Sequence, residues 1–143
     1  MKTYTMVAAG LLIASANALG QKSAPCFASI SSHSEAYVQN AAGNYTLLLT
    51  SLNDGVVESA IAHLTYLRMG SPESDLSEAR EIITTLAETG RTPVIRYKAR
   101  LSMMVFESPE LFAAGVNASS SESDEFFNEI AAKVQKTLLG HNM

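Results

Sequence analysis

The chain has 143 residues, of which 47% are hydrophobic, and its formal net charge at pH 7 is −4. This balance makes nucleic acid and anionic membrane surfaces poor candidate partners, because no large cluster of lysine and arginine offsets the negative charge. The single cysteine, Cys26, excludes a scaffold held by internal disulfides, so packing must hold the fold together.

The first 18 residues predict a cleavable signal peptide. Lys2 supplies a positive start, the apolar stretch from Met6 to Ala14 is too short to cross a bilayer, and small residues at Ala16 and Ala18 suit a signal peptidase. We therefore expect cleavage after Ala18 and export to a periplasmic or secreted location. An uncleaved membrane anchor and a lipoprotein modified at Cys26 are the alternatives.

Removal of this segment leaves about 125 residues, the size of one ordinary domain. Residues 19–33 are rich in serine and alanine without a sustained period, which predicts a flexible linker. Residues 34–143 are expected to form a single helical domain.

Apolar residues recur at spacings of three and four through this domain, and no stretch alternates convincingly as a strand would. The pattern predicts an all-α fold of about five to six helices. They are expected over residues 35–52, 55–69, 76–89, 93–107, 109–114 and 123–139.

Capping residues set the expected boundaries of these helices. Gly43 and Asn44 predict a break or kink in the first helix, and Asp54 is expected to cap the second. Ser74 or Asp75 is expected to cap the third, with Glu78 completing a capping box.

The fourth helix is expected to begin with Thr92 as its N-cap and Pro93 at its first position, where a missing N–H costs nothing. Its inward face is predicted from the apolar spacing. That face comprises Val94, Tyr97, Leu101, Met104 and Val105.

Two segments of the chain share a capped turn followed by paired aliphatic residues and a charge. The segment 54–58 reads Asp-Gly-Val-Val-Glu, and the segment 92–96 reads Thr-Pro-Val-Ile-Arg. Each follows a helix of its own, so residues 35–69 and 75–107 form two predicted hairpins in tandem.

This arrangement resembles a HEAT-like α-solenoid, whose second helices open with such a turn. The resemblance covers about half of the chain and implies antiparallel hairpins stacked side by side, with Glu58 and Arg96 at equivalent positions where they could pair. The alternative is a compact, irregular helix bundle that buries the same residues.

No combination of residues carries a recognised catalytic, metal or cofactor signature. The three histidines are far apart in the sequence, and the acidic runs 73–75 and 122–125 lack the alternating ligands and central glycine of a calcium loop. We therefore predict no catalytic residue, no metal site and no cofactor. Asn44 and Asn117 match the glycosylation acceptor pattern, which matters only in a eukaryotic host.

The only basic concentration lies at the start of the fourth helix. Helical spacing places Arg96 and Arg100 on one face and Lys98 elsewhere, and Arg91 precedes them. We predict that Arg91, Arg96 and Arg100 bind a small anion or an acidic partner near the start of this helix, the alternative being a solvated helix face.

The sequence thus favours an exported, non-catalytic binding or scaffolding module with a protein or peptide partner. The alternative is a small extracytoplasmic enzyme or ligand-binding protein whose site is assembled from distant residues. Its candidate residues are Glu58, His63, Tyr66 and Tyr97.

Overall fold

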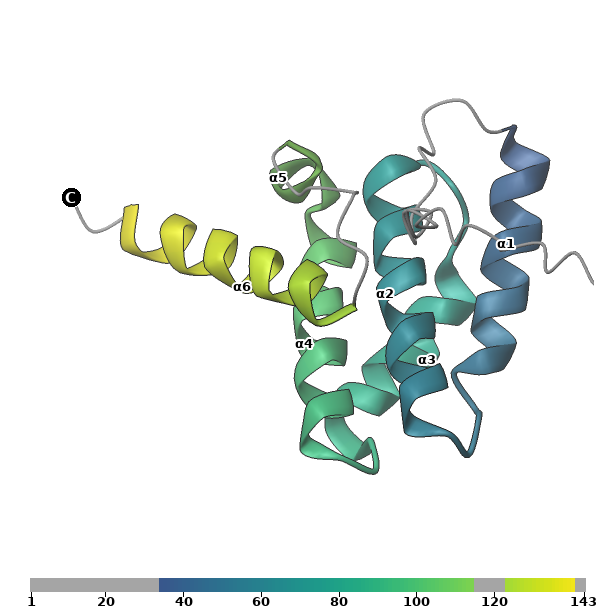
Figure 1. Cartoon of the computed structure of the whole chain (residues 1–143). Coiled ribbons are helices and arrows are strands. Elements are labelled where there is room, and N and C mark those ends of the chain that lie inside the picture. The colour runs from purple at the N-terminus through teal and green to yellow at the C-terminus, as the bar shows by residue number, and fades with distance from the viewer. Residues whose placement is uncertain (1–33, 115–122, 141–143) are drawn as a thin grey trace, which may run out of the picture.

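The computed structural model describes residues 34–114 and 123–140, except for the Leu138 side chain. The described part is all-α, as predicted, and contains six helices and no strand (Figure 1). The helices are α1 (Glu35–Leu48), α2 (Asp54–Gly70), α3 (Ser77–Thr89), α4 (Pro93–Glu107), α5 (Pro109–Ala113) and α6 (Ser123–Gly140). The predicted signal peptide, linker, Cys26 and Asn117 lie outside the described residues.

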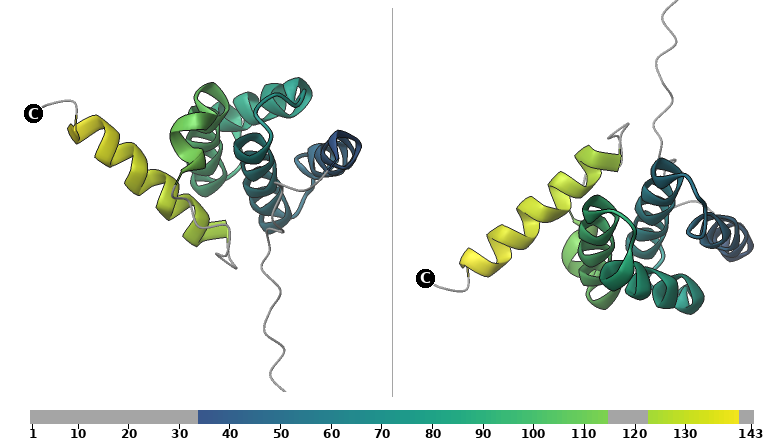
Figure 2. Two further views of the ribbon diagram at one scale, coloured as in Figure 1. Left: turned by 90° about the horizontal axis from the view of Figure 1, so that it is seen from above. Right: turned by 90° about the horizontal axis from the view of Figure 1, so that it is seen from below.

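The first four helices form two consecutive hairpins. Helix α1 packs against α2 and α3 against α4, while α2 lies beside α4 and α1 beside α3. Both hairpin turns lie at the same end of the molecule (Figure 1). Helix α6 runs across α2 and α4, and its C-terminal part projects from the body (Figure 2).

Helix α2 is the central element, because it contacts α1, α4, α5 and α6. The predicted stripe of α2 is buried throughout, as expected. Its members are Val57, Ala60, Ile61, Leu64 and Leu67. Ala62 and Thr65 are also fully buried, so this helix is enclosed on more than one side.

A buried polar contact joins α2 to α4. The Thr65 hydroxyl lies 2.6 Å from the carbonyl oxygen of Ile61 and 2.7 Å from the Ser102 hydroxyl oxygen. Both side chains are inaccessible to solvent, and these bonds satisfy polar groups that would otherwise be costly to bury.

The predicted break in the first helix is wrong. Helix α1 continues through Gly43 and Asn44 and ends at Leu48, four residues before the expected end. Leu52 consequently lies in the turn, where 91% of its surface is exposed. A single glycine costs a helix only about 1 kcal/mol, and the burial of Val38, Ala42 and Thr46 along one side of α1 outweighs that cost.

Two predicted caps are displaced by one or two residues. Asn53, not Asp54, caps α2 by accepting hydrogen bonds from the Gly55 and Val56 amides at 3.0 and 3.4 Å. Helix α3 begins at Ser77 without a side-chain cap. Asp54 becomes the first residue of α2.

The residues predicted to cap α3 have other partners. The Ser74 hydroxyl donates to the Glu35 carboxylate at 2.9 Å, which ties the start of α1 to the connection between α2 and α3. Asp75 accepts from the Ser77 amide at 3.1 Å, just ahead of the helix. The predicted Thr92 cap is confirmed, because its hydroxyl oxygen accepts from the Ile95 amide at 3.1 Å.

Two glycines are expected to respond oppositely to alanine. A Cβ at Gly43 would meet nothing within 4 Å, so Gly43→Ala is expected to raise the free energy of unfolding by about 0.5–1 kcal/mol. A Cβ at Gly90 would lie 2.5 Å from the Leu86 carbonyl oxygen, so Gly90→Ala is expected to lower it by about 1–3 kcal/mol. Urea unfolding of both variants measures these changes, and equal effects would contradict the described packing.

Glu35 is expected to titrate below its ordinary range. Hydrogen bonds from Gln39, and secondarily from Ser74, lower the pKa of this carboxyl. A lowered pKa in the folded chain means that the contribution to stability is present above the ordinary pKa and is lost as the pH falls through the folded value. In an NMR titration, Gln39→Ala should raise the pKa more than Ser74→Ala does. An unchanged pKa in both variants would contradict the assignment.

Candidate docking face on the fourth helix

Helix α4 presents a different inward face from the predicted one. Leu101 and Val105 are buried as expected, but Val94, Tyr97 and Met104 expose 48%, 50% and 43% of their surfaces. The buried side instead carries apolar and polar residues together. It comprises Ile95, Lys98, Ala99, Leu101, Ser102, Val105 and Phe106. The prediction counted apolar residues alone and therefore missed a face that also contains a lysine and a serine.

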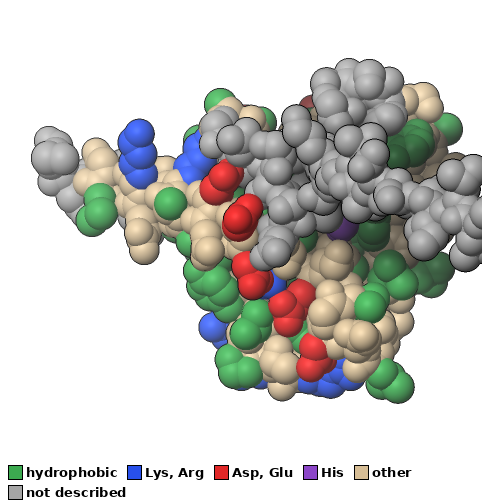
Figure 3. Space-filling model, in the orientation of Figure 1, with side chains coloured by type: hydrophobic (Ala, Val, Ile, Leu, Met, Phe, Trp, Pro, Cys, Tyr) green, Lys and Arg blue, Asp and Glu red, His purple; other side chains and the backbone are tan. Residues whose placement is uncertain are grey.

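The exposed side of α4 carries Val94, Tyr97, Arg100 and Met104, which we call the α4 face. Spacings of three, three and four residues place these side chains along one side of the helix. Figure 3 shows hydrophobic side chains exposed below α6, in the region of α4. Tyrosine, methionine and arginine are residue types enriched at protein interfaces, so this face has the composition of a docking surface.

The three predicted partner-binding arginines have different environments. Arg91 forms an ion pair with Asp54 at 2.6 Å and donates to the Ser51 carbonyl oxygen at 3.0 Å. It therefore fastens the two hairpin turns to each other. Arg96 is half-buried and donates to the Gly90 carbonyl oxygen at 2.6 Å.

Arg100 is exposed on the α4 face. Within residues 34–114 and 123–140, its guanidinium group makes no hydrogen bond and no ion pair. Of the three arginines, Arg100 is consequently the one whose charge is fully available to a partner.

The expected pair between Glu58 and Arg96 is wrong. Glu58 instead accepts from the ammonium group of Lys98 at 2.7 Å. Arg96 turns back to the end of α3, whereas Lys98, two residues further on, points inward toward α2. The repeat pattern therefore predicted the wrong basic partner for Glu58.

The buried side chain of Lys98 is the centre of a polar group that we call the Lys98 cluster, formed with the more accessible Glu58, Ser123 and Asp124. Only 3% of the Lys98 surface is exposed. Its ammonium nitrogen lies 2.7 Å from Glu58, 2.9 Å from Ser123 and 2.5 Å from Asp124. The nitrogen is also 5.8 Å from the centre of the Phe127 ring.

The Lys98 cluster connects three helices. Glu58 comes from α2, Lys98 from α4, and the remaining members from the first turn of α6. A buried ammonium group must be neutralised, and here two carboxylates and a hydroxyl accept its hydrogen bonds. The lysine is fully engaged, so we assign it a structural role in holding α6 against the hairpins.

The residues of the enzymatic alternative have separate environments. Glu58 belongs to the Lys98 cluster, and Tyr97 lies on the α4 face. The His63 Nδ1 atom lies 2.8 Å from the Ser59 carbonyl oxygen, and its ring stacks on Tyr45 at 4.4 Å between centres. Tyr66 packs edge-on against Phe126, and burial raises the pKa of its hydroxyl.

The described residues contain neither a cluster of metal-ligating side chains nor a membrane-spanning helix. No group of three or more histidine, cysteine, aspartate and glutamate side chains there could hold a metal ion. None of the helices in residues 34–114 and 123–140 is long and apolar enough to span a membrane. No protein-family model, curated protein or solved structure matches the chain.

Removing the two carboxylates of the Lys98 cluster should destabilise the protein more than removing its ammonium group. Glu58→Gln/Asp124→Asn leaves a buried ammonium group without a carboxylate and should lower the free energy of unfolding by about 3–5 kcal/mol. Lys98→Met keeps the buried volume apolar and leaves two carboxylates that reach water, so its cost should be clearly smaller.

Urea unfolding of the two variants tests this order. Glu107→Gln/Glu125→Gln, which makes the same charge change at two exposed residues, is the control and should change stability by less than about 0.5 kcal/mol. A Lys98→Met variant less stable than the double carboxylate variant would contradict this order.

Proposed function

We propose that the protein is an exported binding or scaffolding module, without chemistry of its own, that docks a segment of a partner protein on the α4 face. The single observation that carries the proposal is the exposure of Val94, Tyr97 and Met104 beside the unpaired Arg100. The two hairpins, whose sequence pattern resembles that of HEAT-like repeats, serve as the rigid support.

The chemistry of the α4 face specifies the partner segment. The Tyr97 ring and the Met104 thioether are about half exposed, so covering them with apolar side chains of a partner would favour binding through the hydrophobic effect. Arg100 would gain a charge-assisted hydrogen bond from a carboxylate, which a guanidinium group can hold in a bidentate manner. We therefore expect a protein or peptide segment in which apolar residues flank an aspartate or glutamate.

The neighbouring Arg96 supports this choice of charge. It donates to the Gly90 carbonyl oxygen, so its positive charge can act at longer range on an acidic partner, whereas Asp54 offsets the charge of Arg91. The buried side of α4 anchors the face to the core through Ile95, Ala99 and Val105, all of which are at most 1% exposed. A rigid support limits the ordering cost of binding.

The test begins with a photo-crosslinking residue at position 97 in a chain that starts at Leu19. Position 37 on α1, where Tyr37 is 48% exposed, carries the same group as the control. We expect a specific crosslinked partner from position 97 and none from position 37. Equal crosslinking from both positions, or none from position 97, would contradict the proposal.

Binding of the captured partner can then be measured against matched variants. Tyr97→Ser/Met104→Ser and Arg100→Glu should each weaken binding by about tenfold or more, because buried aromatic and arginine side chains dominate interface energies. Tyr37→Ser/Leu47→Ser and Lys136→Glu make the same changes on other exposed surfaces and should alter the affinity by less than about twofold. Equal losses in both sets would remove the α4 face from the proposal.

A further inference from the structure

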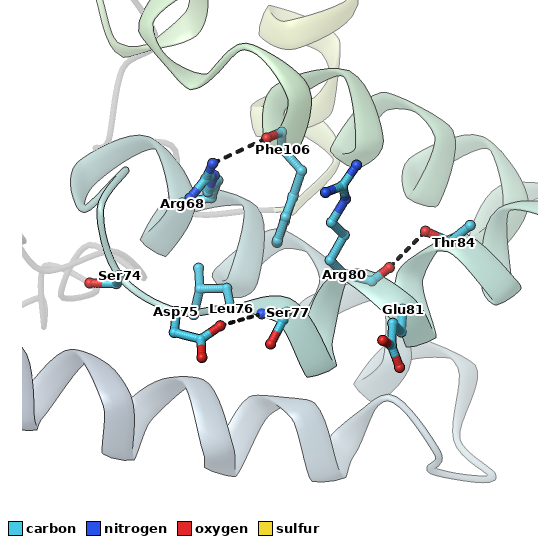
Figure 4. Close-up of a pocket in the computed structure, with 9 residues that line it drawn as sticks. All are labelled: Arg68, Ser74, Asp75, Leu76, Ser77, Arg80, Glu81, Thr84 and Phe106. Carbon is cyan, nitrogen blue, oxygen red and sulfur yellow. Dashed lines mark hydrogen bonds between the residues drawn. The ribbon is translucent and has the colours of Figure 1, made fainter.

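A cleft of about 490 Å³ lies away from the α4 face, where the connection between α2 and α3 meets the end of α4. Its walls come from the end of α2, the connection, the first two turns of α3, and Phe106 on α4. Clefts of this size can hold a small molecule. Two arginines, Arg68 and Arg80, line it together with Phe106 (Figure 4).

Arg68 is held in place by uncharged groups. Its two terminal nitrogens donate to the carbonyl oxygens of Pro72 and Phe106, the latter at 3.4 Å. Its guanidinium carbon lies 5.9 Å from the centre of the Phe106 ring. These contacts fix the orientation of the group but leave its positive charge without a carboxylate within 4 Å among residues 34–114 and 123–140.

Arg80 carries a second such charge. Its side chain is exposed and makes no ion pair within the part of the chain that the structure describes. In Figure 4 the Arg68 and Arg80 side chains flank Phe106 and extend to the same side of the cleft. Two positive charges on one side of a cleft repel each other, and a shared anion relieves that repulsion.

The acidic residues of the cleft do not supply this counter-charge. Figure 4 shows the Asp75 and Glu81 carboxylates pointing to the side opposite the guanidinium groups. Asp75 is also occupied, since it accepts from the Ser77 amide at 3.1 Å. The hydrogen bonds from Ser77 lower the pKa of Asp75.

We propose that this cleft binds a small oxyanion, either a carboxylate or a phosphate group, between Arg68 and Arg80. Guanidinium groups present paired N–H donors whose geometry matches both kinds of oxyanion. Arg68 is oriented in advance by its two carbonyl partners and by Phe106, and Arg80 completes the site by moving toward the bound anion. This site is independent of the α4 face, because the two surfaces share no residue.

Calorimetric titration with inorganic phosphate and, separately, with succinate tests the inference and distinguishes the two sources of the oxyanion. Chloride keeps the ionic strength constant, since general screening would otherwise imitate a specific effect. We expect saturable one-to-one binding of at least one probe. Amide signals of Ser77 and Thr84, which line the cleft, should shift in an NMR titration with the same affinity.

Arg80→Gln is the decisive variant, because its side chain has no structural ion pair to lose. It should weaken binding by about tenfold or more, as expected for the loss of a hydrogen-bonding charge. Lys136→Gln removes an exposed positive charge from α6, away from both surfaces, and should leave the affinity within about twofold. Thermal unfolding without the probe should show that both variants remain folded.

Two results would overturn the inference. The first is that neither phosphate nor succinate binds saturably at constant ionic strength. The second is that Arg80→Gln and Lys136→Gln weaken binding equally, which would indicate a general charge effect. Failure here would leave the proposed docking on the α4 face untouched, since that test uses positions 97, 100 and 104.

Discussion

The enclosure of helix α2 is the constraint on which the rest of the structure depends. Helices α1, α4, α5 and α6 all pack against it, and Ile61, Ala62, Leu64 and Thr65 are fully buried. A helix buried on several sides needs neighbours that approach closely, which explains the alanines at its contacts. Because each neighbour is placed by α2, the faces that α4 and α6 leave exposed follow from the same packing.

The polar contacts in this core determine how the outer elements are fixed. Apolar packing is not directional, whereas the bond between Thr65 and Ser102 and the ion pairs of Lys98 require particular positions. The Lys98 cluster is notable because Asp124 and Ser123 lie in α6, which follows α4 only after α5 and residues 115–122. A helix that projects from the body is thus held at its first turn by charge as well as by Phe126, Phe127 and Ile130.

The two surfaces available for binding differ in chemistry and in place. The α4 face is partly apolar and is proposed to dock another polypeptide. The cleft beside Phe106, proposed to bind a small anion, is lined by two arginines that have no carboxylate partner among residues 34–114 and 123–140. A helical fold alone supports neither assignment, because similar scaffolds carry unrelated functions. Both assignments therefore depend on individual side chains, chiefly Tyr97 and Arg100 in one case and Arg68 and Arg80 in the other.

The amino-acid sequence by itself determined the helical class, the approximate helix boundaries, the Thr92 cap and the buried stripe of α2. These features are local, since they depend on residue spacing and on the backbone needs of a helix end. The sequence did not reveal that Lys98 is buried, that Tyr97 is exposed, or that Arg68 and Arg80 line one cleft. Those features depend on which helices meet, and only the tertiary structure decides that. An apolar pattern cannot identify Lys98 as a buried charge, because its carboxylate partners lie 26 and 40 residues away in the sequence.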